Sequence, residues 1–201
     1  MKRLFGAGGL ALLLFYHCAR AQVIEFMSNG LKYQALTRSS VTVMYAHLPT
    51  RLHEYAIVQV AVSNGSPGTY VIRPEDFSYI RSGDLGTVQA ASAYTVIEML
   101  MQKGNAADVI KLVTTYESGV YGNAHFRSTN GYEQRRQAAL AFGGTKLKAA
   151  TTASALAMVQ TKLASGETTD GAVFFPNQGK PLTGGRVVVR TNTDVFEFNV
   201  E

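Results

Sequence analysis

Aromatic and arginine side chains are concentrated in one stretch of the sequence, between residues 121 and 136. Three arginines are interspersed there with tyrosine, phenylalanine and histidine. A guanidinium group binds carboxylate and phosphate groups in a two-pronged geometry and stacks on aromatic rings, so this composition fits an anionic ligand or an acidic polymer. The predicted ligand or partner site consists of Tyr121, His125, Phe126, Arg127, Tyr132, Arg135 and Arg136.

A solvated helix face is the alternative interpretation of the second half of this stretch. Glu133 can pair only with Arg136, three residues later, because the residue four positions later is Gln137. Such a surface pair is weak. The sequence leaves both the ligand site and the solvated face open.

No motif in the chain specifies a reaction. A catalytic set would draw on His125 or His53 with Glu117, Asp108 or a serine. The sequence contains no Gly-x-Ser-x-Gly elbow, no His-Glu-x-x-His pair and no phosphate-binding loop. Because scattered residues do not define a catalytic triad, we expect a protein that is not an enzyme.

Cofactor and metal motifs are equally scarce. The acids Glu75 and Asp76, and Asp170 beside a glycine, lack the spacing of a calcium-binding loop and are better explained as turn formers. The histidines show no spacing of a metal box. We therefore expect no cofactor and no metal.

The first 21 residues have the three-part pattern of a secretory signal peptide. Lys2 and Arg3 precede an apolar stretch from residue 4 to residue 16, and Ala19-Arg20-Ala21 supplies a cleavage site before Gln22. The apolar stretch is shorter than the roughly 20 residues that span a bilayer. We expect a periplasmic or secreted protein that starts at Gln22 and has no membrane span after cleavage.

Signal removal also changes the charge and the cysteine content. Without residues 1–21 the chain has 16 basic and 14 acidic residues, a net charge of +2, which gives little support for nucleic-acid binding. Cys18, the single cysteine, leaves with the signal, and the bulky residues 15–17 before it disfavour a lipid-attachment site. The fold must then rest on its apolar core without disulfides.

The stretch from Glu54 to Gly65 is predicted to be the central strand, around which the rest of the chain is arranged. Its nearly unbroken apolar, β-branched run is typical of a strand buried on both sides. Asn64-Gly65 has the chemistry of a tight reversal with positive φ angles, and Pro49 is expected to stop the preceding strand. Further strands are predicted at 22–26, 31–36, 41–48, 69–72 (pairing with the central strand), 78–81, 171–175, 186–190 and 195–200.

The middle of the chain has a helical pattern. Apolar residues recur at helical spacing, and capping residues or glycines separate the segments. Residues 117–131 show no periodicity and form a predicted loop. Helices are expected at 92–103, from 105 onward, from a capping pair of Asn130 and Glu133 through Phe142, and at 145–164.

Strands at both ends of the chain suggest an antiparallel two-sheet sandwich, with a helical insertion at about residues 90–164 of a single domain, 22–201. On this interpretation the helices lie outside the sandwich. The alternative is an α+β fold in which helices back one antiparallel sheet.

Two segments carry a resemblance to a known family. The run YAIVQVAVSNGSPGTYVIRPEDFSYI, residues 55–80, and the run LASGETTDGAVFF, residues 163–175, resemble signatures of secreted bacterial immunoglobulin-like domains of unknown function. This resemblance covers about forty residues and implies an extracytoplasmic sandwich from a bacterial host. Such modules serve as binding or assembly parts in different systems.

We therefore expect a non-catalytic interaction or assembly module of the bacterial envelope or secretome, with a protein partner. Partner binding is expected at the loop of the insertion or at an exposed edge strand that accepts a partner strand. The alternative is a protein that binds a small or anionic ligand, or an enzyme, with its site at the insertion loop. Nothing in the sequence specifies the oligomeric state.

Overall fold

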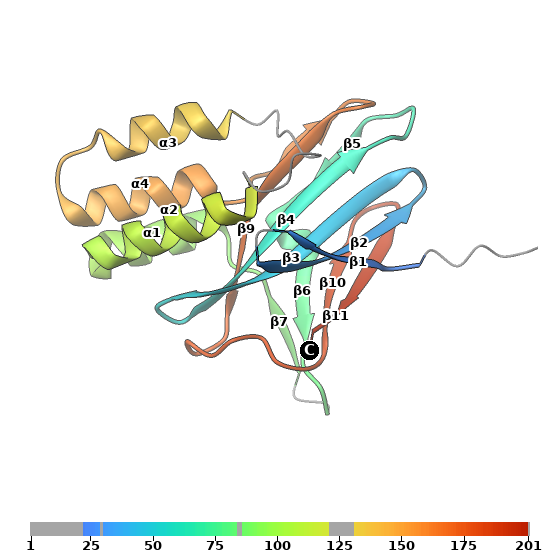
Figure 1. The fold of residues 1–201 in the computed structure, drawn as a ribbon, viewed down its shortest axis with the longest axis horizontal. Coiled ribbons are helices and arrows are strands. Elements are labelled where there is room, and N and C mark those ends of the chain that lie inside the picture. Colours follow the sequence, from blue (N-terminus) through green and yellow to red (C-terminus); the bar gives the residue numbers. More distant parts are fainter. Residues whose placement is uncertain (1–21, 29, 84–85, 121–130, 201) are drawn as a thin grey trace, which may run out of the picture.

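A computed structural model describes residues 22–28, 30–83, 86–120 and 131–200 of the chain. Within these ranges the fold is mainly antiparallel β, with two stacked sheets and a layer of helices (Figure 1). The prediction of a β-rich antiparallel fold is thereby confirmed. No helix among the described residues is long and apolar enough to cross a bilayer.

The central layer is a five-stranded sheet in the order β1-β2-β3-β4-β9, with every neighbouring pair antiparallel. As predicted, β4 is buried on both faces: every residue but Ser63 is buried. The five strands are β1 (Ile24–Ser28), β2 (Leu31–Arg38), β3 (Val41–Leu52), β4 (Tyr55–Asn64) and β9 (Thr168–Pro176).

A second, four-stranded sheet covers one face of the central sheet. The core between the two sheets includes Val58 and Val60 of β4 together with Phe77, Phe196 and Phe198 of the second sheet. The order in this sheet is β11-β10-β6-β7, formed by β11 (Val195–Asn199), β10 (Arg186–Arg190), β6 (Phe77–Ile80) and β7 (Thr87–Gln89).

The helices cover the opposite face of the central sheet (Figure 1). Leu100, Tyr116 and Leu156, from three different helices, are almost fully buried in a second core with Ile57 and Phe174 of the sheet. The helices are α1 (Ala93–Lys103), α2 (Ala106–Val120), α3 (Tyr132–Leu140) and α4 (Thr145–Leu156). The helices thus lie outside the core between the two sheets, and their apolar faces build this second core against the central sheet.

A predicted strand end, a predicted strand pairing and a predicted helix end are also wrong. Strand β3 continues through Pro49 because a register shift between His47 and Arg51 accommodates the residue that cannot donate to the ladder. The predicted hairpin partner of β4, β5 (Tyr70–Ile72), pairs instead with β8 (Thr161–Leu163). Helix α4 ends at Leu156 and not at residue 164, because the last residues of the predicted helix form β8.

Asn64 does not form the predicted tight reversal, since neither Asn64 nor Gly65 has a positive φ. Its fully buried side chain bridges two loops. The amide nitrogen donates to the carbonyl oxygens of Gly68, Leu163 and Ala164, and the amide oxygen accepts from the backbone of Ser66. Asn64 thus joins the end of β4 to the chain that leads into β9.

The two sides of the sandwich differ in how they are closed. On one side β7 lies against β9, and a bridge between Ala91 and Phe174 links the sheets. On the other side β11 lies beside β2, and Figure 1 shows the edge strands β1 and β11 on this same side. We call this second side the open side, and the candidate site lies there.

Candidate functional site

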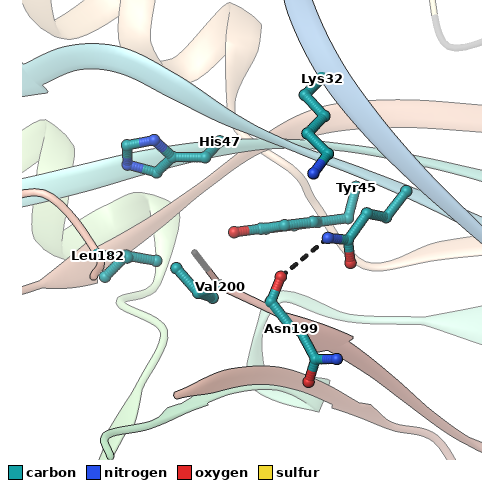
Figure 2. Close-up of a pocket in the computed structure, with 7 residues that line it drawn as sticks. Lys32, Tyr45, His47, Leu182, Asn199 and Val200 are labelled. Atoms are coloured by element: carbon teal, nitrogen blue, oxygen red, sulfur yellow. Dashed lines mark hydrogen bonds between the residues drawn. The ribbon is translucent and has the colours of Figure 1, made fainter. Parts of the chain in front are cut away.

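A hollow of about 210 Å³ lies on the open side, between the central sheet and β11. Alternation along β2 and β3 places Gln34 and Tyr45 on the face toward the second sheet, where neighbouring positions hold core residues such as Leu36 and Val43. We call this hollow the polar pocket. Its lining residues are Lys32, Gln34, Tyr45, His47, Leu182, Asn199 and Val200 (Figure 2).

Three buried polar atoms of the pocket have no hydrogen-bond partner among the described residues: Gln34 Oε1, the Tyr45 hydroxyl and His47 Nε2. Gln34 and Tyr45 are only 5% and 4% exposed. Figure 2 shows the Tyr45 hydroxyl directed toward the space between His47, Leu182 and Val200. Because native proteins pair nearly all buried polar atoms with protein groups or ordered water, three such atoms around one hollow indicate a place where water or another polar group binds.

The Gln34 amide is held in a fixed orientation. Its nitrogen donates to the Asn199 carbonyl oxygen at 2.9 Å, drawn as a dashed line in Figure 2, and to Glu25 Oε1 at 3.1 Å. Both amide hydrogens are therefore used within the protein. The amide oxygen remains as an acceptor for a bound group.

The polar pocket is nearly neutral at physiological pH. Burial raises the pKa of Tyr45, as does the nearby Tyr79, so the phenol keeps its proton and can donate. Burial lowers the pKa of His47, so its ring is uncharged near pH 7. The Lys32 ammonium lies 3.2 Å from Glu25 Oε2, which compensates its charge. The pocket thus offers donors and acceptors to an uncharged group such as a hydroxyl or a carboxamide.

Replacing Tyr45 by phenylalanine is expected to stabilise the fold by about 1 kcal/mol, because it removes a buried hydroxyl that has no partner in the protein. The free energy of unfolding in urea measures the effect. Tyr79→Phe is the matched control, since the Tyr79 hydroxyl is bonded to the carbonyl oxygens of Thr183 and Gly184 and its loss should destabilise the fold by a similar amount. Destabilisation by Tyr45→Phe would contradict the prediction.

His47 is expected to make stability depend on pH. Because its pKa is lower in the folded chain than in the unfolded chain, protons bind preferentially to the unfolded chain below about pH 6.5. The contribution of His47 is therefore complete above pH 6.5 and declines as the pH falls from there. Urea midpoints at pH 7.5 and 5.5 should drop more for the natural chain than for His47→Gln. Equal drops in both chains would show that His47 titrates normally.

The residues predicted from the sequence fall into two groups. Arg136 Nε lies 2.5 Å from Glu117 Oε1 of α2, and Arg135 donates to the Ala155 carbonyl oxygen of α4 at 3.1 Å. Both guanidinium groups thus tie α3 to neighbouring helices, Arg135 to α4 and Arg136 to α2. Tyr132 is the first residue of α3. Tyr121, His125, Phe126 and Arg127 lie outside the described residues, and the ligand role of the whole set stays a prediction.

A second hollow, of about 500 Å³, brings together two residues that the sequence only hinted at. His53, at the β3–β4 turn with a φ of 51°, contacts Asp108 Oδ2 of α2 through Nε2 at 2.9 Å. The Asp108 carboxylate is buried and also accepts from the Asn105 backbone, as the start of a helix favours. Arg51 and Lys111 line the same hollow.

Sequence reasoning missed the polar pocket because its residues are distributed over three strands and a loop. A weak signal was present: Gln34 occupies a core-facing position of β2, two residues before Leu36. A polar residue in the apolar phase of a strand indicates either a buried network or a site. Only the packing of β11 beside β2 distinguishes the two.

Comparison with protein-family models, curated proteins and solved structures finds no match to this chain. Within the ranges that the structure describes, no three histidine, cysteine or acidic residues are grouped in a way that could hold a metal ion. The inference about function therefore rests on the geometry of the chain itself.

Proposed function

We propose that this chain is a non-catalytic, exported, immunoglobulin-like module that binds an extended segment of a protein partner along the open side of its sandwich. The partner lays a strand against an exposed sheet edge and places one uncharged polar side chain in the polar pocket. The observation that carries the proposal is the set of buried polar atoms at Gln34, Tyr45 and His47, all lining one small hollow.

The edges of the open side support strand addition. Both β1 and β11 end their sheets, with no further strand beside them among the described residues. On β1, Ile24 and Met27 are 64% and 67% exposed. An uncovered edge offers backbone hydrogen bonds to an added strand, while a neighbouring pocket selects its side chains.

The size of the polar pocket supports a side chain as its occupant. At about 210 Å³ it is smaller than the roughly 300 Å³ at which ligand pockets for drug-sized molecules begin. The ring of Tyr45, which lines the pocket, stacks on the ring of the core residue Phe198 with the ring centroids 5.5 Å apart, and this contact holds Tyr45 in place. A rigid, small, neutral pocket suits one glutamine, asparagine, serine or threonine of a partner segment.

Site-specific photocrosslinking in cells tests the proposal. A photoreactive residue in place of Met27 should give a crosslinked partner, whereas the same residue in place of Tyr94, 73% exposed on α1, should not. Adding Tyr45→Phe should reduce the yield from position 27 severalfold without lowering stability. Crosslinks from position 94 alone, or a crosslinking yield from position 27 that Tyr45→Phe leaves unchanged, would overturn the proposal.

Binding of a small anion is a second candidate, favoured by the hollow around His53. Three basic side chains, Arg51, His53 and Lys111, line it, and its one carboxylate, Asp108, is already bonded to His53. A titration with inorganic phosphate followed by the NMR signals of His53 tests this candidate. Unchanged signals, or equal changes in His53 and His47, would exclude it.

A further inference from the structure

We propose that the end of the helical layer at which α1 leads into α2 and α3 leads into α4 docks on an anionic lipid surface. Four helix ends meet there: the carboxyl ends of α1 and α3 and the amino ends of α2 and α4 (Figure 1). We call this end, residues 103–111 and 141–148, the helical tip. Its docking is independent of the partner binding proposed for the open side.

Exposed apolar side chains are concentrated at the helical tip. Ile110 is 64% exposed, Phe142 is 47% exposed and Leu147 is 37% exposed. Ile110 and Phe142 line one shallow hollow of about 370 Å³ together with Lys148. These side chains face outward from three different segments, so they are not the margin of a single buried helix face.

The charge of the helical tip is strongly one-sided. Its two segments contain Lys103, Lys111, Lys146 and Lys148 and a single acid, Asp108. Asp108 is buried and bonded to His53, so it presents no carboxylate to a partner. Apolar side chains among lysines complement an anionic surface that also has an apolar interior.

A lipid surface fits this geometry better than a protein does. The three exposed apolar side chains of the tip make up only a small part of the roughly 800 Å² that each partner contributes to a stable protein interface. A bilayer surface deforms around a protruding tip, takes up apolar side chains at the level of the headgroups, and leaves lysine ammonium groups among the phosphates.

Vesicle binding of the exported chain, with its N-terminus checked by mass spectrometry, tests the proposal. The chain should sediment with vesicles of phosphatidylcholine and phosphatidylglycerol, and at least tenfold less with phosphatidylcholine alone. The double variants Ile110→Asp with Phe142→Asp, and Lys146→Glu with Lys148→Glu, should each lose at least tenfold in partitioning. Tyr94→Asp, at the opposite end of α1, is the matched control and should bind as the natural chain does.

A fluorescence measurement tests the proposal even if the double variants fail to fold. The natural chain contains no tryptophan, so Phe142→Trp introduces a single fluorophore at the tip. Its emission should shift to the blue on anionic vesicles, while that of Tyr94→Trp should not. Equal binding to neutral vesicles, binding by the tip variants, an unshifted Phe142→Trp, or a preference for poly-glutamate over lipid would each overturn the proposal.

Discussion

Replacing Gly171 by alanine is expected to lower the free energy of unfolding by about 3 kcal/mol. Gly171 lies in β9, and a Cβ atom there would lie 2.5 Å from the Cα and 2.6 Å from the N of Met158. Met158 cannot easily move away, because its backbone donates to the Ala172 carbonyl oxygen and its side chain is buried in the core between the sheets. The added methyl group must therefore displace backbone.

Gly68→Ala is the matched control for this substitution. No atom lies within 4 Å of the position that its Cβ would take, and its φ is not in the left-handed region. Its free energy of unfolding should stay within about 0.5 kcal/mol of that of the natural chain. Urea denaturation of both variants gives the comparison. A Gly171→Ala chain as stable as the Gly68→Ala chain would show that Gly171 and the Met158 backbone are packed less closely than the structure indicates.

Asn64→Ala is expected to lower the free energy of unfolding by about 4 kcal/mol, which is a larger effect than that of Gly171→Ala. It removes the donors to three carbonyl oxygens and the acceptor of the Ser66 backbone N–H, all at a side chain that is fully buried. Each buried group left without a partner costs about 1–3 kcal/mol, partly offset where water reaches it.

Asn177→Ala separates this effect from the loss of an ordinary loop amide. The Asn177 amide also donates to two carbonyl oxygens, those of Lys180 and Pro181, in bonds exposed to solvent, and its oxygen accepts from Arg81 in a partly buried bond. Water replaces the two exposed bonds, and only the bond to Arg81 is lost from a partly buried position, so a loss of no more than about 1 kcal/mol is expected. Similar losses for Asn64→Ala and Asn177→Ala, measured by urea denaturation, would contradict the bridging role of Asn64.

The spacing of apolar residues predicted the strands well where the sequence showed one clear pattern, either a continuous apolar run or a strict alternation. The apolar run of β4 indicated burial on both faces, and the alternation in β11 indicated one buried face, because period and burial are coupled within a single strand. Pro49 was misjudged because a proline ends a strand only when no bulge relieves the ladder, and the bulge depends on the neighbouring strand.

The sequence predicted less well which strands pair with one another and which surface each helix packs on. Residues 69–72 lie directly after β4 and had the pattern of its hairpin partner, yet β9 and β3 occupy both edges of β4, so β5 pairs with β8 instead. The same limit applies to the helices. Their apolar spacing was visible, but their place on the sheet depends on residues such as Ile57 and Phe174, far away along the chain.

The sequence by itself determined the antiparallel, β-rich character of this protein and the positions of most of its strands and helices, because those depend on the spacing of apolar residues over short stretches. Only the tertiary structure decided that the helices form a second core, that Asn64 bridges two loops, and that Gln34, Tyr45 and His47 surround one pocket. Those features arise where strands distant in the chain meet, and short-range patterns contain no information about which distant surfaces are complementary.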